Sequence, residues 1–484
     1  MKKHYPLLIA KAGPGYARLE VTAPYDGAPI ATLDTANSDA VDLALSTAYG
    51  LFRDRSCWLD IEQRVEIFRR AAGIMREQAE RLALEAAREG GKPLADSQDE
   101  VARAIDGVDI CVETLRRQSG EEIPMHLNAA SSHRVAFTRH EPIGVVVAIS
   151  AFNHPLNLIV HQVAPAVATG CPVIVKPAED TPLSCMRFVE ILREAGLPEE
   201  WCQALTVSDI PVATKLVTDP RVGFFTFIGS AKVGWMLRSQ LSPGTRCALE
   251  HGGVAPAIVA ADADLDAAID LLAKGGFYHA GQVCVSVQRV LADRSIARTL
   301  AERLADRARV LKVGDPTLPD TQVGPLIRKS EVARVEEWVR EAVDGGAEAL
   351  CGAEVLSPST YAPTVLFEPP GDAKVSTHEV FGPVVCVYAY DALHDAIARA
   401  NSLPVAFQAA VFTRDIDTAM AAYEHLDASA VMVNDHTAFR VDWMPFAGLR
   451  ESGLGIGGIP HTMHDMQTEK MLVMRSPALG GLST

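Results

Sequence analysis

The spacing of hydrophobic residues changes near residue 140. Before it, over residues 39–52, 61–89 and 97–118, apolar positions recur every three or four residues among Ala, Leu, Glu and Arg. That spacing predicts amphipathic helices. After it, short runs rich in Val, Ile and Phe take over, and most are followed by a stretch with helical spacing. The chain therefore predicts a helical segment followed by alternating strands and helices.

The predicted strands fall into two groups. The first comprises residues 144–150, 172–177, 202–207 and 224–230, and the second comprises residues 257–261, 289–294, 363–368, 384–390, 409–414 and 431–435. Helices are predicted between them, at residues 157–170, 184–196, 231–241, 264–279, 295–310 and 329–345. Strands that alternate with helices favour parallel sheets covered on both faces, so we expect two α/β domains.

Two strand-like segments stand apart from both groups, at residues 131–143 and 469–477. Outlying strands have unpaired backbone groups that need a neighbour. We expect these two to pair with each other or with a partner subunit.

Length and composition narrow the function classes. A chain of 484 residues is expected to form two or three domains, and its 48% hydrophobic and 22% charged residues are typical of a globular protein. The formal charge of −16 argues against nucleic acid or an anionic membrane as a partner. No apolar run reaches the roughly 18 residues of a membrane span. Nine cysteines without a CxxC pair predict reduced thiols in the cytoplasm.

Cys284, in the run AGQVCVSVQ, is the strongest candidate for chemistry. A thiolate is a potent nucleophile, and this cysteine follows a predicted helix that Gly281 should end, where the chain turns into a strand. Glu250 ends the apolar stretch CALE just before Gly252 and Gly253, a setting that would raise its pKa and suit it to act as a base. The alternatives are a buried structural thiol and a solvated carboxylate.

Three further polar residues follow predicted strands. The uncharged amide of Asn153 suits the stabilisation of an oxyanion, together with the backbone N–H of Cys284. The alternative is a turn residue beside Pro155. Lys176 and Glu179 end the next strand, at the edge where open α/β sheets bind ligands, and they could reach the ribose or phosphates of a dinucleotide. The alternative is a pair of solvated loop charges.

Two glycine-rich segments differ in how strongly they indicate a dinucleotide-binding site. Residues 229–234 open a helix after a predicted strand, where glycines let backbone N–H groups approach a diphosphate. Residues 453–458, GLGIGG, match the dinucleotide fingerprint G-x-G-x-x-G, but no strand precedes them and no helical pattern follows before Pro460. We expect a loop there. His461 and His464 lack carboxylate or cysteine partners, so no metal site is predicted.

Together these segments resemble the aldehyde dehydrogenase superfamily over nearly the whole chain. The motifs that occur in the family's order are FNHPLNL, VIVKPAEDTPLS, FIGSAKVG, LEHGG, GQVC, EVFGPV and MPFAGLRESGLG. The resemblance implies an α/β fold with a Rossmann-like NAD-binding domain at residues 1–121 and 141–251 and an α/β catalytic domain at residues 252–465. A small β flap for oligomerisation, at residues 122–140 and 466–484, implies a homodimer or homotetramer.

The same resemblance assigns roles to individual residues. Cys284 would be the nucleophile, Glu250 the general base and Asn153 the oxyanion donor. The cofactor contacts would be Lys176, Glu179, Phe227, Gly229, Ser230, Val233, Gly252, Glu379 and Phe381.

The implied reaction is the oxidation of an aldehyde to the carboxylic acid. The Cys284 thiolate attacks the aldehyde, hydride passes to the nicotinamide, and Glu250 activates the water that hydrolyses the thioester. Relatives that pass the acyl group to coenzyme A typically lack a glutamate at this position, so Glu250 disfavours a coenzyme A-acylating semialdehyde dehydrogenase. Glu179 favours NAD over NADP, because its charge would repel a 2′-phosphate.

A short polar or anionic aldehyde is the expected substrate. The segments AGQVCVSVQRV and NDHTAFRVDWMPFAG look most like the subgroup of lactaldehyde, phosphonoacetaldehyde and family-21 dehydrogenases. Arg440 is the candidate that would face the substrate, with His154, His436 and Arg103 as helpers. The alternative for Arg440 is an ion pair with Asp442 or a subunit contact.

Some positions depart from the family pattern. Leu usually follows the base, where His251 stands, and Thr is usual at the position of Ile228. Phosphate-handling relatives often have Arg where Val283 stands. These departures keep a catalytically silent relative with a binding or structural role as an alternative. A cofactor-independent thiol esterase would leave Lys176 and Glu179 unexplained.

Overall fold

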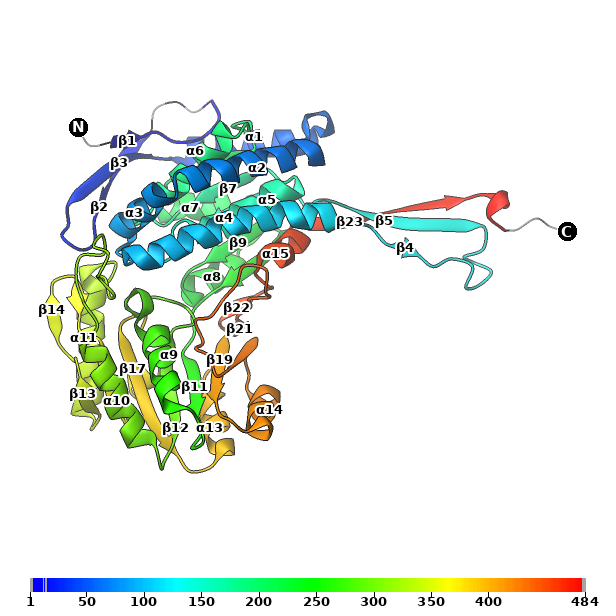
Figure 1. Ribbon diagram of the computed structural model, residues 1–484. Helices are drawn as coiled ribbons and strands as arrows, with labels where there is room; N and C mark the ends of the chain where they lie inside the picture. Colours follow the sequence, from blue (N-terminus) through cyan, green and yellow to red (C-terminus); the bar gives the residue numbers. More distant parts are fainter. Residues whose placement is uncertain (1–2, 12, 14, 481–484) are drawn as a thin grey trace.

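The computed structural model describes residues 3–11, 13 and 15–480. The outermost residues of the predicted domain ranges, 1–2 and 481–484, lie outside these described residues. Two α/β bodies lie one above the other in Figure 1, and a thin arm projects from the upper one.

The first sheet has six strands in the order β22–β10–β9–β6–β7–β8. All neighbouring strands are parallel except β22, which runs antiparallel to β10. The strands are β6 (Val145–Ile149), β7 (Val173–Lys176), β8 (Cys202–Ala204), β9 (Val222–Ile228), β10 (Arg246–Glu250) and β22 (Gly453–Leu454). The four strands predicted for this region are present, whereas β10 and β22 were not foreseen.

Alternate residues of β6 enter different hydrophobic clusters on the two faces of the first sheet. Val146 and Ala148 pack with α2, α4, α5 and α6, whereas Val145 and Val147 pack with α1 and α7. A strand that is covered on both faces reads as a continuous apolar run, which is why this one was predicted. The helices are α1 (Ser38–Arg53), α2 (Ile61–Glu77), α3 (Ala79–Gly90), α4 (Leu94–Arg117), α5 (Asn157–Thr169), α6 (Leu183–Glu194), α7 (Ile210–Thr218) and α8 (Ala231–Arg238).

The second sheet has seven strands in the order β13–β16–β17–β12–β11–β19–β20. β13 is antiparallel to β16, and every other pair is parallel. The strands are β11 (Ala255–Val259), β12 (Val287–Asp293), β13 (Glu348–Cys351), β16 (Thr364–Phe367), β17 (Val384–Tyr390), β19 (Gln408–Phe412) and β20 (Ala430–Val433). The helices around it are α9 (Leu265–Phe277), α10 (Ala297–Arg309), α11 (Lys329–Asp344), α12 (Lys374–Thr377), α13 (Leu393–Ala400) and α14 (Ile416–His425).

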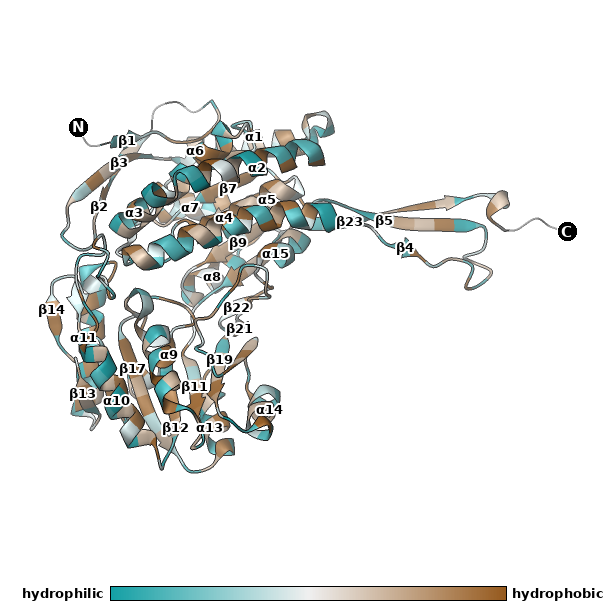
Figure 2. Cartoon of the chain, in the orientation of Figure 1, coloured by the Kyte–Doolittle hydropathy of each residue, from teal (hydrophilic) through white to brown (hydrophobic). Residues whose placement is uncertain are grey.

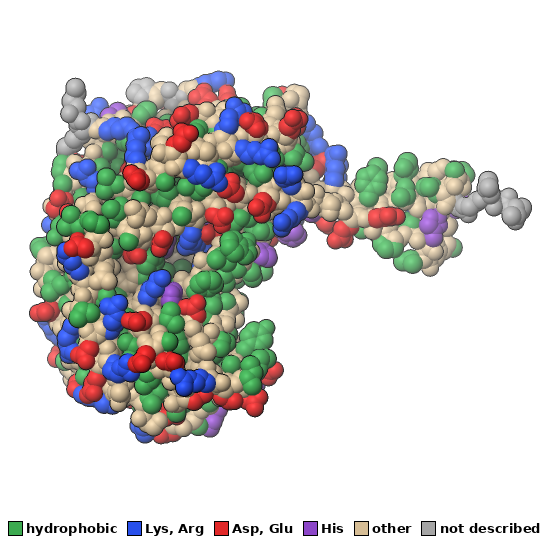
Figure 3. Space-filling view, in the orientation of Figure 1, with side chains coloured by type: hydrophobic (Ala, Val, Ile, Leu, Met, Phe, Trp, Pro, Cys, Tyr) green, Lys and Arg blue, Asp and Glu red, His purple; other side chains and the backbone are tan. Residues whose placement is uncertain are grey.

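The arm is a three-stranded sheet formed by β4 (Glu122–Ile123), β5 (Arg134–Pro142) and β23 (Gln467–Arg475). β23 pairs antiparallel with β5 along its whole length, so the prediction that the two outlying segments pair with each other is confirmed. Parts of β5 and β23 have the colour of hydrophobic residues in Figure 2, and hydrophobic side chains gather on the arm in Figure 3. The exposed ones are Phe137, Met471, Leu472, Val473 and Met474.

Other parts of the chain also differ from the prediction. Residues 61–89 form two helices that meet at Gln78, with no Gly or Pro to mark the break. A small sheet of β1 (Lys3–Tyr5), β2 (Ala17–Thr22) and β3 (Pro29–Thr35) precedes the first helix. Late in the chain, β22 and α15 (Ile459–Asp465) return to pack with the first sheet and its helices, although we placed residues up to 465 in the second domain. These two elements lie inside the predicted range of the second domain but pack with the first. The exact domain boundaries remain a prediction.

Candidate active site

The candidate site is a cavity of about 600 Å³ that draws its walls from both bodies. The carboxyl ends of β6, β9 and β10 line one side of it. The other side consists of residues from the segments 278–285, 379–381 and 438–446. Ligands of open parallel sheets bind at this edge, so the cavity lies where the topology places a site.

Cys284 reaches this cavity through a tight reversal of the chain. α9 ends at Phe277, and the next residues include His279, Ala280 and Gly281 in the left-handed region, at φ of 47°, 54° and 70°. A Cβ at Gly281 would lie 2.0 Å from the carbonyl oxygen of Gly382, so only glycine fits there. The helix was expected to break at Gly281, and it ends four residues earlier. Burial, with Glu379 and Glu250 nearby, raises the pKa of the Cys284 thiol to about 12.

Asn153 is held against the segment that carries Cys284. It follows β6, is buried, and donates a hydrogen bond from Nδ2 to the carbonyl oxygen of Gln282 at 2.9 Å. This bond uses one of the two amide hydrogens and fixes the side chain beside Cys284. The second amide hydrogen is available to a negatively charged oxygen in the cavity.

Glu250 is the last residue of β10 and lies under the GLGIGG segment. β22 pairs Gly453 with Glu250, and a Cβ at Gly457 would lie 2.4 Å from Glu250 Oε1. A short helix, α15, does follow this segment, contrary to expectation, but the glycines face the carboxylate and β10. Burial raises the pKa of Glu250, and Arg440 opposes the shift. A carboxylate with a raised pKa is suited to accept a proton from water.

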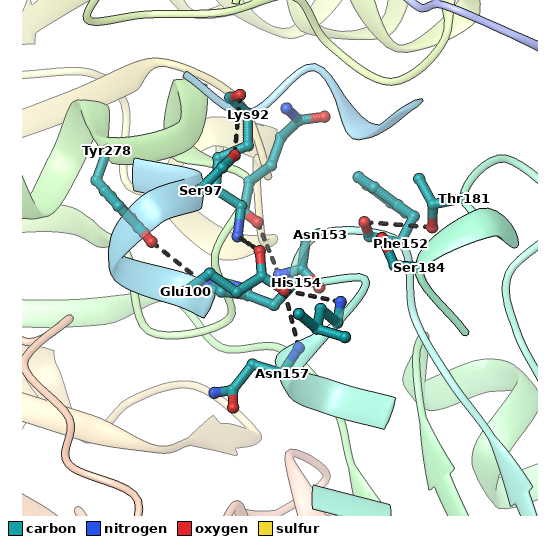
Figure 4. A network of polar contacts seen from close by, with 12 residues as sticks. Lys92, Ser97, Glu100, Phe152, Asn153, His154, Asn157, Thr181, Ser184 and Tyr278 are labelled. Carbon is teal, nitrogen blue, oxygen red and sulfur yellow. Dashed lines mark hydrogen bonds and ion pairs between the residues drawn. The ribbon is translucent and has the colours of Figure 1, made fainter. Parts of the chain in front are cut away.

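Two buried carboxylates occupy helix N-termini near the cavity. Glu100 Oε1 accepts hydrogen bonds from the backbone of Leu156 at 2.8 Å and of Asn157 at 2.9 Å, at the start of α5 (Figure 4). Its other oxygen pairs with Lys92, also buried. Glu89 accepts bonds from the backbone of Leu183 and Ser184 at the start of α6, at 2.7 and 2.8 Å. Each carboxyl group accepts hydrogen bonds from free N–H groups at a helix N-terminus.

The N-terminus of α8 has no such carboxylate among the described side-chain contacts. Its N-cap, Ser230, makes no side-chain capping bond, and Gly229, Ser230 and Val233 line the cavity. Backbone N–H groups at a helix N-terminus bind phosphate oxygens. The α8 turn is therefore a helix end in this cavity that could bind the diphosphate of a dinucleotide.

Glu379 and Phe381 line the same end of the cavity. A Cβ at Gly252 would lie 1.9 Å from Glu379 Oε1. This oxygen is buried and has no hydrogen-bond partner among the described residues, so it could bind a ligand hydroxyl. Burial raises the pKa of Glu379 to about 8. Phe381 has φ of 47° and packs edge-on against Phe152 at 5.8 Å. Together with the free α8 turn, this unpartnered oxygen fits a nicotinamide dinucleotide, as do the lining positions of Phe227 and Gly252.

Lys176 and Glu179 lie at the cavity's edge and do not line it, although their neighbours Ala178 and Asp180 do. Lys176 Nζ lies 3.9 Å from Glu179 Oε1, and burial lowers the pKa of the lysine. The opposite charges of Lys176 and Glu179 thus partly neutralise each other.

Arg440 lies over the ring of Phe446 at 3.6 Å and lines the cavity. The expected alternative, an ion pair with Asp442, is not formed, because Arg103 binds that carboxylate at 2.7 and 3.0 Å. Arg440 Nη2 instead donates to His161 Nδ1 at 3.3 Å, and His161 Nε2 donates to Asp442 at 2.7 Å. Burial lowers the pKa of His161 to about 4, so the imidazole is neutral.

The two remaining substrate candidates have different positions. His154 lines the cavity, with Nε2 at 3.4 Å from the hydroxyl of Tyr278, and burial holds its pKa well below the usual range. His436 does not line the cavity. Its side chain packs where a Cβ of Gly275 would be, at 2.8 Å, so we no longer include it in the substrate site.

A family model described as the aldehyde dehydrogenase family matches residues 11–472. The chain belongs to this family. It is 36% identical over 457 residues to the 3-sulfolactaldehyde dehydrogenase of Priestia aryabhattai, covering 94% of this chain and 95% of that protein. Aldehyde dehydrogenase 21 of Physcomitrella patens, solved with the reaction product succinate, is 34% identical with a TM-score of 0.94, over 98% of this chain and 99% of that one.

A glyceraldehyde-3-phosphate dehydrogenase of Methanocaldococcus jannaschii, complexed with NADP, is 34% identical with a TM-score of 0.90, over 95% of this chain and 99% of that one. Membership in the aldehyde dehydrogenase family makes the chain an NAD(P)-dependent, non-acylating oxidoreductase that converts aldehydes to acids. The predicted fold class is confirmed.

Sequence reasoning missed the charged residues that hold the site together. Lys92, Glu89, Glu100 and Asp442 are all buried, although charged residues of these types are usually solvated. Lys92 and Glu100 pair with each other eight residues apart, but the other groups that Glu89, Glu100 and Asp442 bind lie far away in the sequence. No local pattern therefore distinguishes these residues. Among the described residues, no group of three or more His, Cys, Asp or Glu could hold a metal ion. Within the same residues, no helix is long and apolar enough to cross a membrane.

Proposed function

We propose that this aldehyde dehydrogenase oxidises short, anionic aldehydes to carboxylic acids with NAD. The observation that carries the proposal is the distribution of charge around Arg440 and Arg103, which line the cavity. Asp442 is neutralised by Arg103, whereas the direct contacts of Arg440 among the described residues are a neutral imidazole and an aromatic ring. Glu250 and Asp442 lie near enough to act on its charge, but neither forms an ion pair with it. A cation without a direct ion-pair partner in a partly buried site favours an anionic ligand.

The chemical roles follow from the contacts. Cys284 Sγ attacks the aldehyde carbon, and the oxyanion of the resulting thiohemiacetal accepts hydrogen bonds from Asn153 and the Cys284 N–H. Bound NAD supplies the hydride acceptor. Glu250 then takes a proton from a water, which attacks the thioester and releases the acid. Arg440 and Arg103, with His154, orient the anionic end of the substrate.

Preference for NAD over NADP rests on Glu179, whose carboxylate would accept a hydrogen bond from the adenosine 2′-hydroxyl and repel a 2′-phosphate. Lys176 beside it, at 3.9 Å, is the opposing influence. A Glu179→Gln variant is expected to lower KM for NADP and raise KM for NAD. An unchanged ratio of the two kcat/KM values would remove Glu179 from this role.

Assembly into a homodimer or homotetramer is proposed through the arm. Its apolar side chains on β5 and β23 are about half exposed, for example Met471 at 55% and Met474 at 50%. Exposed apolar patches of this kind mark protein–protein interfaces. A Met471→Asp/Met474→Asp variant should sediment as a smaller species, whereas Ile210→Asp, a matched change on α7, should not.

The first experiment is to follow NADH production over short aldehydes that differ in polarity and charge. Propanal, lactaldehyde, succinic semialdehyde and a sulfonated aldehyde form such a panel, with Cys284→Ala as control. We expect the anionic members to have the highest kcat/KM and Cys284→Ala to be inactive. A neutral aldehyde as the best substrate would overturn the anionic preference. Binding of NADH without turnover of any aldehyde would favour the silent relative.

A further inference from the structure

His251 directly follows the proposed base and is buried at 2% exposure. Its backbone N–H donates to the carbonyl oxygen of Ser452 at 2.9 Å, and its ring Nδ1 lies 2.9 Å from the carbonyl oxygen of Gly229. A carbonyl can only accept, so Nδ1 carries the proton and donates it. The side chain therefore connects the end of β10 to the turn that begins α8.

A second hydrogen bond joins the same two segments in the opposite direction. The backbone N–H of Gly229 donates to the carbonyl oxygen of Glu250 at 3.0 Å. Gly229 thus has both of its backbone groups bound to residues 250 and 251. The turn at the start of α8 and the segment that carries the base are one hydrogen-bonded unit.

The ring of His251 is also enclosed by α8 and β9. It lies 5.7 Å from the ring of Phe227 and 5.9 Å from the ring of Trp235, both in steeply inclined orientations. A Cβ at Gly234 would lie 2.0 Å from His251 Cε1, so the helix needs glycine there to admit the imidazole. We expected Gly234 to serve the approach to a diphosphate, and its closest neighbour is this histidine instead.

We infer that His251 is a positioning residue for the cofactor, which holds the Gly229–Ser230 turn in a fixed place relative to Glu250. The inference rests on the proposed binding of the dinucleotide at this turn. Leu, which is usual at this position in the family, would fill space beside Phe227 but would leave the Gly229 carbonyl without its donor. A turn that is already fixed loses less conformational freedom when its N–H groups bind the diphosphate.

The test is the dissociation constant of NADH, followed by quenching of tryptophan fluorescence in the full-length protein without aldehyde. His251→Leu is expected to weaken NADH binding about tenfold, the effect of one lost hydrogen bond to a buried group. His251→Asn, whose amide can occupy the place of Nδ1, should restore affinity to within about threefold of wild type. KM for the aldehyde at saturating NAD should stay unchanged in both variants.

Substitution of Gly234 tests the same role of His251 from the other side of their contact. Gly234→Ala should weaken NADH binding by displacing the imidazole, and His251→Ala in the same chain should recover part of the loss, because the clash is removed. Alkylation of Cys284 by iodoacetamide at the wild-type rate would show that the segment around Cys284 keeps its structure in each variant.

The outcomes separate the two proposals. NADH affinity of His251→Leu within about twofold of wild type, or additive effects of the Gly234 and His251 changes, would overturn the role of His251 and leave the dehydrogenase function standing. Failure of the wild-type protein to bind NADH or NADPH would overturn the proposed cofactor and the His251 role with it.

Discussion

Arg103 binds both carboxylate oxygens of Asp442, at 3.0 Å from Nε and 2.7 Å from Nη2. The two residues come from α4 and from the segment between β20 and β22, and Arg103 also lines the cavity. Hydrogen bonds from His161 and Arg103 hold the pKa of Asp442 far below its usual range despite burial. The carboxylate is thus occupied by other partners, and among the described residues Arg440 forms no ion pair.

Replacement of Arg440 should separate anionic from neutral substrates. In Arg440→Met, we expect kcat/KM for an anionic aldehyde to fall about 10- to 100-fold, the value of a charge-assisted hydrogen bond, with propanal little affected. The control is Arg414→Met, which changes an exposed arginine just after β19. Equal losses for both aldehydes would show that Arg440 does not recognise the charge.

Glu100 is expected to be essential for stability. Glu100→Ala leaves a buried Lys92 ammonium and two N–H groups at the start of α5 without an acceptor, which should lower the free energy of unfolding by about 3–5 kcal/mol. Glu113→Ala, on the exposed face of the same helix, should cost almost nothing. Guanidinium titration of both variants measures this, and a loss as small as that of Glu113→Ala would contradict it.

The reactivity of Cys284 should rise steeply with pH in the protein without cofactor. Its pKa is raised to about 12, so the thiol is protonated at neutral pH, and each unit of pH below that pKa should increase the alkylation rate about tenfold. Glu379→Gln removes a carboxylate that is charged only above about pH 8, so it should speed alkylation at alkaline pH and change it little at neutral pH. Site-resolved mass spectrometry distinguishes Cys284 from the exposed Cys57. A plateau near neutral pH would contradict the raised pKa.

Glu250→Gln should trap the covalent intermediate. Without a base for water, thioester hydrolysis should slow by about 10²–10⁴-fold, whereas hydride transfer proceeds once per site. Rapid mixing should therefore show a burst of NADH close to one per active site, followed by almost no turnover. A variant that loses the burst as well would place Glu250 in the first step.

The sequence predicted the two sheets because their central strands are buried on both faces. Val145–Ile149 and Val384–Tyr390 read as continuous apolar runs, and their ends were placed within two residues. Ala17–Thr22 was not found, since only Val21 of that strand is buried and the other residues leave no apolar pattern. Gln78, which separates two helices, has nothing in its side chain that opposes a helix.

The sequence predicted the candidate reactive residues of the site but did not reveal the buried charged residues that hold them in place. Cys284, Glu250 and Asn153 line one cavity, as expected from their places at strand and helix ends. Asp442 and Glu100 make most of their contacts with residues tens to hundreds of positions away, and only the folded chain brings these together. The exception is Lys92, eight residues before Glu100, and no local signal shows that this pair is buried.

The return of the chain to the first sheet gives the enzyme an order of assembly. β10 carries Glu250 and is made early, but the strand beside it, β22, and the Ser452 carbonyl that binds His251 are made some two hundred residues later. During synthesis the first body can form most of its core before then. The base, however, is set in place only when the last part of the chain arrives, so a nascent or truncated enzyme would expose its thiol without being able to finish the reaction.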